Sequence, residues 1–234
     1  MPDLGQPVPN WTPPPRPPRT PLKGRYAALE PLDPDTHAAE IHRANTQDDR
    51  IWDYLPYGPF SSAAAYHRWT RDMAVSEDPL FYAIRNLETG HAEGVVSYLR
   101  IAPEAGSIEV GHINLSKPLQ KTRAATEAIY LTMQWAFDAG YRRFEWKCNA
   151  LNLGSRRAAE RLGLSYEGVF RQAAVIKGRN RDTAWFAAID SEWPALQEAF
   201  SAWLAPSNFD DDGRQHERLS DMTRLVRVSS DPAL

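Results

Sequence analysis

The sequence predicts an α/β domain built on one mixed β-sheet, and two observations carry this prediction. In the first half, apolar segments over residues 81–85, 94–101 and 108–115 are separated by short turns, which is typical of an antiparallel meander. In the second half, a helical pattern over residues 122–139 is followed directly by a strand over residues 143–149. A strand, a crossover helix and a second strand form a right-handed unit with two parallel neighbours. A sheet with both kinds of pairing follows.

The chain has 234 residues, enough for one large domain with appendages but not for two full domains. Its net charge of −3 argues against a general nucleic-acid coat or a polybasic membrane binder. The single cysteine, Cys148, excludes an intramolecular disulfide framework and a cysteine-cluster metal site, and we expect it to be a buried strand residue. No apolar run is long enough to span a bilayer. We therefore expect a cytoplasmic protein without a nucleic-acid, membrane or metal partner.

The N-terminal segment is rich in proline, with eight prolines in residues 7–21. Proline fixes φ and removes a backbone donor, so residues 1–21 are predicted to form an extended arm. Residues 13–18 can serve as a ligand for an aromatic-groove domain. The favoured alternative is an arm packed on its own domain through Trp11, or lying across a second subunit.

The remaining elements follow from local signals. Residues 25–32 are expected to form a strand and residues 37–45 a helix, followed by a structured aromatic loop over 51–60 and a helix to about residue 75. The later elements are a helix over 155–162 closed by Gly163, strands over 168–176 and 183–189 joined by a basic hairpin tip over 177–181, and a helix over 192–204.

The chain is thus divided into three parts. An arm covers residues 1–21, an α/β domain covers residues 22–190, and a C-terminal helix with a polar tail covers residues 191–234. The tail from residue 206 onward is expected to be partly disordered unless a partner orders it.

Candidate chemistry gathers where predicted strands meet helices. The exposed amides at the start of the helix after residue 115 suit an anion such as a pyrophosphate, although any strand-to-helix turn offers such amides. Glu109 lies in the preceding strand, and Asn152 and Ser155 begin the next helix. An Asn side chain can bind amides of a ligand, and a Ser hydroxyl can donate a proton. The alternatives are a helix cap for Asn152 or Ser155 and an exposed strand position for Glu109.

The order of these motifs resembles the GNAT superfamily of acetyl-CoA-dependent N-acetyltransferases over about residues 22–190. The resemblance rests on the strand over 107–115, the helix start over 120–128, the strand over 144–149, and the run NLGSRRAAERLGLSYEG over residues 152–168. Within the superfamily, the ribosomal-protein alanine acetyltransferase branch (RimJ/RimL-like) is most similar. The resemblance implies a splayed, mostly antiparallel seven-stranded sheet flanked by helices, whose fourth and fifth strands part to hold the pantetheine arm.

The resemblance also assigns residues to acetyl-CoA as co-substrate. Backbone groups of Asn114 and Leu115 would pair with pantetheine or the acetyl carbonyl, Asn152 would hold the pantetheine amide, and Ser155 would protonate the leaving thiolate. The pyrophosphate loop would comprise Gln120, Lys121, Thr122, Arg123, Ala124 and Ala125. Arg123 stands where this loop carries its first glycine, which permits left-handed dihedrals that arginine tolerates poorly. Its guanidinium can itself pair with a phosphate.

For the acceptor amine, the resemblance implies Glu109 as general base, from its spacing of eleven residues before Gln120. His112 is a second candidate, but strand alternation puts it on the opposite face from Glu109 unless a bulge intervenes. Trp52, Asp53 and Tyr54 match the region that covers the acceptor site in the family, and aromatic faces beside an acid suit a cationic amine.

The expected activity is acetyl transfer from acetyl-CoA to a primary amine by direct attack, the acceptor being a protein N-terminus or a small molecule. The alternative is a catalytically inactive GNAT-fold binding or regulatory module. A homodimer is expected from the branch and the arm. Arg156, Arg157 and Arg161 follow Ser155, and we expect at least two of them to be solvated charges instead of phosphate ligands.

Overall fold

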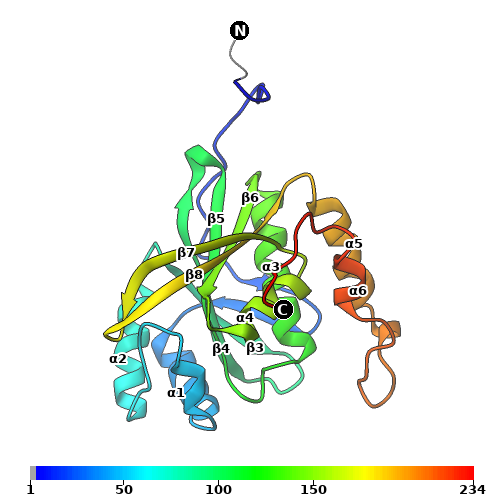
Figure 1. Cartoon of the computed structure of the whole chain (residues 1–234). Helices are drawn as coiled ribbons and strands as arrows, with labels where there is room; N and C mark the ends of the chain where they lie inside the picture. Colours follow the sequence, from blue (N-terminus) through cyan, green and yellow to red (C-terminus); the bar gives the residue numbers. More distant parts are fainter. Residues whose placement is uncertain (1–3) are drawn as a thin grey trace.

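The computed structural model describes residues 4–234, which are built around a single eight-stranded sheet (Figure 1). The strands lie in the order β1-β2-β3-β4-β5-β6-β8-β7. Their bounds are Leu22–Lys23 (β1), Ala27–Pro31 (β2), Leu80–Asn86 (β3), Ala92–Ala102 (β4), Ser107–Leu115 (β5), Arg143–Asn149 (β6), Ser165–Ile176 (β7) and Arg179–Ile189 (β8). Only β5 and β6 pair in parallel within this described sheet, so the mixed, mostly antiparallel fold is confirmed. The expected count of seven omitted β1, whose two residues are too short to show a pattern.

Helices cover both faces of the sheet. Their bounds are Pro34–Asn45 (α1), Ala63–Ala74 (α2), Arg123–Asp138 (α3), Leu153–Arg161 (α4), Trp193–Leu204 (α5) and Leu219–Thr223 (α6), with short 3-10 turns at Asp49–Trp52 (η1), Pro103–Ala105 (η2) and Pro206–Asn208 (η3). Residues of β3 and β4 enter two separate apolar clusters, one under α3, α4 and α5 and the other under α1 and α2, while buried apolar residues of β5 and β6 enter the first cluster. None of the helices within residues 4–234 combines the length and apolarity needed to cross a membrane.

The divergence of β5 and β6 is the feature that positions the site. The two strands pair only from Ser107–Arg143 to Val110–Trp146. Beyond that point β5 stays with β4 as far as Leu115, while β6 stays with β8 as far as Asn149. Over residues 111–115, the edge of β5 that faces β6 therefore has no strand paired with it within the described chain, while the other edge stays paired with β4. The result is the V-shaped opening that the family resemblance implies.

A β-bulge reorients the end of β5. Between the pairs Val95–Asn114 and Ser97–Gly111, two residues of β5 lie opposite one residue of β4, and His112 has a φ of 50°. A bulge of this kind shifts the alternation of side chains by one position. His112 consequently contacts Phe81 of the cluster under α1 and α2, on the face that Glu109 also occupies. The bulge therefore places His112 on the same face of β5 as Glu109, as the sequence analysis expected only if a bulge was present.

The hairpin between β7 and β8 is tighter than predicted. Its turn is Lys177-Gly178, with φ values of 48° and 72°, and not the five residues 177–181. Two consecutive left-handed residues give the turn that matches the twist of the flanking strands. Arg179 to Arg181 therefore belong to β8.

The arm packs on its own domain. Tyr141 donates a hydrogen bond to the carbonyl of Pro15 (3.1 Å), and Tyr82 donates one to the carbonyl of Pro18 (2.7 Å). The Arg142 guanidinium lies 5.6 Å from the centre of the Trp11 ring. These contacts fix an extended segment that has few backbone hydrogen bonds of its own.

The expectation of a partly disordered tail is wrong, because the domain itself orders residues 206–234. Asp231 is fully buried and forms a two-bonded ion pair with Arg156 (2.5 Å for each bond). Arg161 lies over the Trp203 ring at 4.9 Å and donates to the Thr126 hydroxyl at 3.1 Å. Neither arginine is a solvated charge or is directed at the cofactor loop, so that expectation is also wrong for these two. A polar tail gives no apolar periodicity from which this packing could be predicted.

Candidate active site

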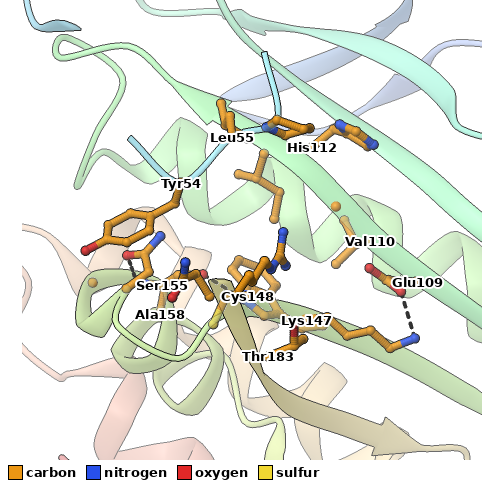
Figure 2. Close-up of a pocket in the computed structure, with 18 of the residues that line it drawn as sticks. Tyr54, Leu55, Glu109, Val110, His112, Lys147, Cys148, Ser155, Ala158 and Thr183 are labelled. Atoms are coloured by element: carbon orange, nitrogen blue, oxygen red, sulfur yellow. Dashed lines mark hydrogen bonds and ion pairs between the residues drawn. The ribbon is translucent and has the colours of Figure 1, made fainter. Parts of the chain in front are cut away.

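A cavity of about 790 Å³ lies where β5 and β6 separate (Figure 2). Its wall contains Glu109 and Leu115 from β5, the loop residues Gln120 and Lys121, Asn152 and Ser155 at the start of α4, and Tyr54. These seven residues, proposed from the sequence, are thus brought together around one space. The other proposed residues lie outside this wall: Trp52, Asp53, Asn114, Thr122, Arg123, Ala124 and Ala125.

Glu109 is a buried carboxylate, not an exposed strand residue. Its Oε2 accepts from Arg100 Nη1 at 2.7 Å and from Lys147 Nζ at 2.9 Å. Burial raises the pKa of Glu109, while the charges of Lys147 and Arg100 act in the opposite direction. The two cations therefore oppose the effect of burial and favour the ionised form of this acid in the cavity wall.

Lys147 is a site residue that the sequence analysis missed. Its Nζ lies 2.7 Å from Glu145 and 3.7 Å from the centre of the Trp185 ring. The parallel register places Glu109 directly opposite Glu145, and Lys147 follows two residues later on the same face of β6. The signal was present in the alternation of β6, but it could be used only once the register of β5 and β6 was known.

His112 lies in the same wall in its neutral form. Its ring stacks on Tyr57, with centres 5.6 Å apart, and Nδ1 lies 3.3 Å from the Tyr57 hydroxyl. Burial lowers the pKa of His112 to about 4, with help from the positive charges of Arg100 and Arg181. An imidazole with this pKa is uncharged at neutral pH, so His112 can accept or donate a hydrogen bond beside Glu109.

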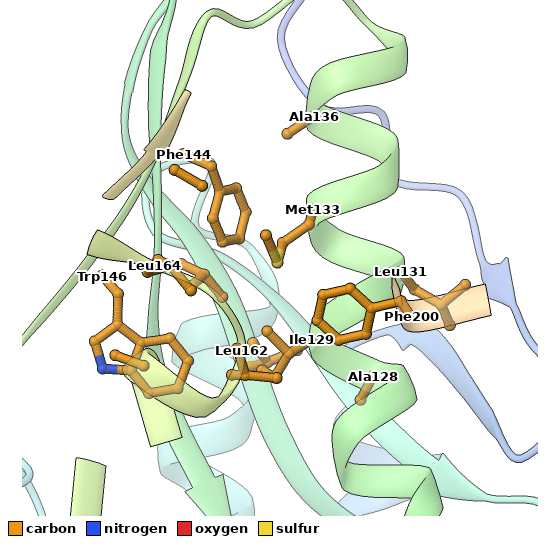
Figure 3. Close-up of a cluster of buried hydrophobic side chains, with 14 of the residues drawn as sticks. Ala128, Ile129, Leu131, Met133, Ala136, Phe144, Trp146, Leu162, Leu164 and Phe200 are labelled. Atoms are coloured by element: carbon orange, nitrogen blue, oxygen red, sulfur yellow. The ribbon is translucent and has the colours of Figure 1, made fainter. Parts of the chain in front are cut away.

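Asn152 and Ser155 are coupled at the start of α4. Asn152 is the N-cap, and its Oδ1 accepts from the Ser155 amide at 3.0 Å. The Ser155 oxygen accepts from Trp146 Nε1 at 3.0 Å. Trp146 belongs to the apolar core (Figure 3), which holds the indole in place. With its oxygen accepting from the indole, the Ser155 hydroxyl keeps one proton to donate. Burial raises the pKa of the thiol of Cys148, another residue of the cavity wall, and a hydrogen bond with Ser155 acts in the opposite direction.

The loop before α3 offers fewer amides than the sequence suggested. The Gln120 amide donates to the Ser116 carbonyl (3.0 Å), the Thr122 amide donates to the Leu119 carbonyl (3.3 Å), and the Ala125 amide donates to the Thr122 hydroxyl (3.1 Å). Among the amides of residues 120–125, those of Lys121, Arg123 and Ala124 have no hydrogen-bond acceptor within the described chain. They stand at the positive end of α3, where an anion is favoured.

Arg123 does not occupy a position that requires glycine. The left-handed residue of the loop is Lys121, with a φ of 63°, and Arg123 is the first residue of α3. The Arg123 guanidinium lies 4.7 Å from the centre of the Tyr26 ring and 4.9 Å from that of Phe209. The loop therefore accommodates the missing glycine, and the guanidinium lies between two aromatic rings outside the cavity wall.

The acceptor residues taken from the aromatic loop need correction. Trp52 is 3% exposed and packs in the cluster under α1 and α2, because a large apolar ring gains more from the core than from the surface. Asp53 is exposed and lies outside the cavity wall. Tyr54 lines the cavity and donates to the Leu151 carbonyl at 3.2 Å. Lys177 donates to the Trp52 carbonyl at 2.8 Å, which joins the β7–β8 hairpin to this loop.

Asn114 also differs from a cavity residue. It is 1% exposed, and its Oδ1 accepts from Asn45 of α1 at 2.9 Å. The side chain thus ties β5 to α1, and only the backbone of Asn114 is left for the role that the resemblance implies.

A splayed mixed sheet, a helix start with unused amides and a buried carboxylate in a cavity at the opening of the sheet are the arrangement expected of an acyltransferase. The model of the GNAT acetyltransferase domain matches residues 28–165, which is more than half of the chain. The protein belongs to the GNAT acetyltransferase family.

Solved structures agree with this assignment. A GCN5-related N-acetyltransferase from Brucella melitensis is 44% identical, with a TM-score of 0.91 over 93% of this chain and 100% of that one. A probable acetyltransferase of the GNAT family from Chromobacterium violaceum ATCC 12472 is 37% identical, with a TM-score of 0.77 over 83% of this chain and 98% of that one. No match was found among curated proteins. These structures support the family assignment, and their names do not identify an acceptor.

Proposed function

We propose that the protein transfers an acetyl group from acetyl-CoA to a primary amine, by direct attack of the amine on the thioester. The observation that carries this proposal is the cavity at the divergence of β5 and β6, whose wall holds both Glu109 and Ser155. The acceptor is a protein N-terminus or a small-molecule amine.

The residues present fit acetyl-CoA. The unused amides of Lys121, Arg123 and Ala124 suit its pyrophosphate, and the open edge of β5 suits the amides of its pantetheine arm. The Asn152 side chain keeps its Nδ2 donor unused within the described chain, since only Oδ1 is engaged in capping. The cavity lies within the size range of small-molecule sites, about 300–1,000 Å³. When bound, acetyl-CoA supplies an acyl group activated as a thioester.

A structure of the microcin C7 self-immunity acetyltransferase MccE in complex with acetyl-CoA and AMP has the same fold, at 21% identity and a TM-score of 0.63. At this identity the likeness concerns the fold alone. Acetyl-CoA bound to a protein of this fold supports acetyl-CoA as the donor and says nothing of the acceptor.

The chain's own residues would manage two protons. An attacking amine must be neutral, and the Glu109 carboxylate can take its proton directly or through a water molecule. Arg100 and Lys147 favour the ionised form of Glu109. At the other side of the cavity, the Ser155 hydroxyl, whose oxygen is held by the hydrogen bond from Trp146 Nε1, can supply a proton to the departing thiolate.

The proposal is tested by calorimetric titration of the purified protein with acetyl-CoA and CoA. We expect micromolar dissociation constants and, for Asn152→Ala, about tenfold weaker binding, the usual scale for loss of one buried hydrogen bond. Asn10→Ala, in the exposed arm, is the control. Absence of binding up to millimolar concentrations would contradict the proposal and favour the inactive binding module.

Replacing Ser155 with Ala is expected to lower kcat about 10- to 100-fold and to change acetyl-CoA binding much less, since a proton donor acts in the transition state. Release of CoA thiol measures the first quantity and calorimetry the second. Trp146→Phe, which removes the indole donor and keeps most of the ring, is expected to show a smaller loss. Equal losses of turnover and binding in Ser155→Ala would reduce Ser155 to a structural residue.

Three finer predictions remain part of the proposal. The ribosomal-protein acetyltransferase branch is supported by the Asn152 and Ser155 pair and by Gly163 at the end of α4. A candidate ribosomal-protein-serine acetyltransferase from Vibrio cholerae shares the fold at 16% identity and a TM-score of 0.64. The second prediction is a homodimer, which size-exclusion chromatography with light scattering checks. The third is a cytoplasmic location.

A further inference from the structure

Arg181 stands out in the cavity wall. The two-residue turn at Lys177-Gly178 places Arg181 inside β8, where it is paired with Ala174 of β7. Residues two apart in a strand share a face, so Arg181, Thr183 and Trp185 project to the same side. All three line the cavity.

The charge of Arg181 has no partner. Its Nε is fully buried and makes no hydrogen bond, and no carboxylate lies within ion-pair distance among residues 4–234. Two more deeply buried cations have carboxylate partners: Arg156 is paired with Asp231, and Lys147 with both Glu109 and Glu145. Arg161 has no carboxylate partner among residues 4–234, but it donates to Thr126 and lies over the Trp203 ring. Burial costs this guanidinium its solvation and lowers the pKa of Arg181, and the attraction of Glu109 and Cys148 offsets only part of that loss. Such a group is matched when an anion enters the cavity.

The acidic side chains of the cavity wall do not neutralise the charge of Arg181. Glu109 is the one acidic side chain in the described wall, and its carboxylate is already shared by Arg100 and Lys147. The basic side chains in the same wall are Arg50, Arg100, Lys121, Lys147 and Arg181. A second ammonium group on the acceptor would meet repulsion here and no unshared carboxylate, so a polyamine does not suit this cavity.

The position of Arg181 connects it with the acceptor and not with the phosphates. Trp185 shares its face of β8, and the Trp185 ring centre lies 3.7 Å from Lys147 Nζ, which is itself 2.9 Å from Glu109 Oε2. The charge of Arg181 also acts on Cys148, on Glu109 and on His112. The unused amides for a pyrophosphate belong to Lys121, Arg123 and Ala124, beyond the far end of β5. Lys177 of the same hairpin contacts the loop between α1 and α2. Arg181 thus lies with the proposed base, where an amine would approach.

We infer that Arg181 binds a carboxylate carried by the acceptor, which makes the acceptor an amine that also bears an acidic group. This inference rests on the proposed function, since it takes the cavity as the acceptor site. A guanidinium presents two parallel N–H donors that match the two oxygens of a carboxylate. The carboxylate can belong to a free amino acid or to an acidic side chain at a peptide N-terminus.

The test compares amines that differ only in this charge. Calorimetry in the presence of saturating CoA follows the binding of ω-amino acids of two to five carbons and of their amides, for example 4-aminobutanoate and 4-aminobutanamide. A second arm uses the peptide amides Glu-Ala-Ala and Gln-Ala-Ala, which separates a peptide source of the carboxylate from a free amino acid. Each series is measured on the wild type, on Arg181→Gln and Arg181→Lys, and on Arg179→Gln, an exposed control in the same strand.

We expect at least one acid to bind the wild type about tenfold or more tightly than its amide, on the scale of a charged hydrogen-bonded pair. The preference should fall to near unity in Arg181→Gln, be partly restored in Arg181→Lys and be unchanged in Arg179→Gln. CoA affinity should be unaffected in all variants. No acid preference in either arm, or a preference that survives in Arg181→Gln, overturns the inference.

The two proposals fail separately in this design. Failure to bind acetyl-CoA or to release CoA thiol with any amine contradicts the proposed function. The acid preference is an equilibrium property that needs no acetyl group, so it still decides whether Arg181 is a carboxylate site.

Discussion

Replacing Glu109 with Gln is expected to lower kcat for amine acetylation about 100-fold or more, with little change in the affinity for acetyl-CoA. The amide keeps the shape of the carboxyl group but cannot accept a proton from the attacking amine. Folding is expected to survive, because Lys147 retains Glu145 as a partner and Arg100 is largely exposed. CoA thiol release gives the rate, and calorimetry gives the affinity.

The same residue predicts how the rate depends on pH. Burial raises the pKa of Glu109, so the base is protonated, and activity is lost, as pH falls through a value above the ordinary 4.5. Arg100→Gln removes a cation that lowers this pKa, and the acidic limb of kcat/KM should then move to higher pH. His112→Asn is the matched control on the same face of β5. Loss of activity in His112→Asn with full activity in Glu109→Gln would transfer the role of base to His112.

The large-scale architecture was predictable because it depends on local signals. Turns between apolar segments predicted the meander, and the helical pattern before residue 143 predicted the crossover that makes β5 and β6 parallel. Asn152 and Ser155 could be placed at a helix start for the same reason. In each case the signal lies within a few residues of the structure that it predicts.

The errors have a common physical origin in long-range packing. The bulge at His112 depends on the register between β4 and β5, which no short segment encodes. Trp52 carries the same aromatic signal whether it lines a cavity or fills the core, and only its contacts with α1 and α2 decide between them. Arg181 was placed in the hairpin tip over residues 177–181 because polar residues around a glycine indicate a turn, and its unpaired charge is visible only when the wall around it is assembled.

Replacing Asp231 with Ala is expected to be the most destabilising single change in the tail, costing about 3–5 kcal/mol of unfolding free energy. The substitution leaves the Arg156 guanidinium buried without its carboxylate, and that uncompensated charge is the source of the cost. For a chain of this size each kcal/mol corresponds to about 2–4 °C in Tm, so a fall of roughly 6–20 °C is expected by calorimetric melting. Asp221→Ala, an exposed acid in α6, should change Tm little.

A double variant distinguishes the charge from the packing. In Arg156→Met/Asp231→Ala no buried charge remains, so much of the lost stability should return, and the two single changes should be strongly non-additive. Arg156 also donates to the Ala150 carbonyl at 2.7 Å, just before the Asn152 cap. If Asp231→Ala leaves Tm unchanged, the tail does not stabilise α4. If Tm falls and acetyl-CoA affinity falls with it, the tail holds the turn that presents Asn152 and Ser155 to the cavity.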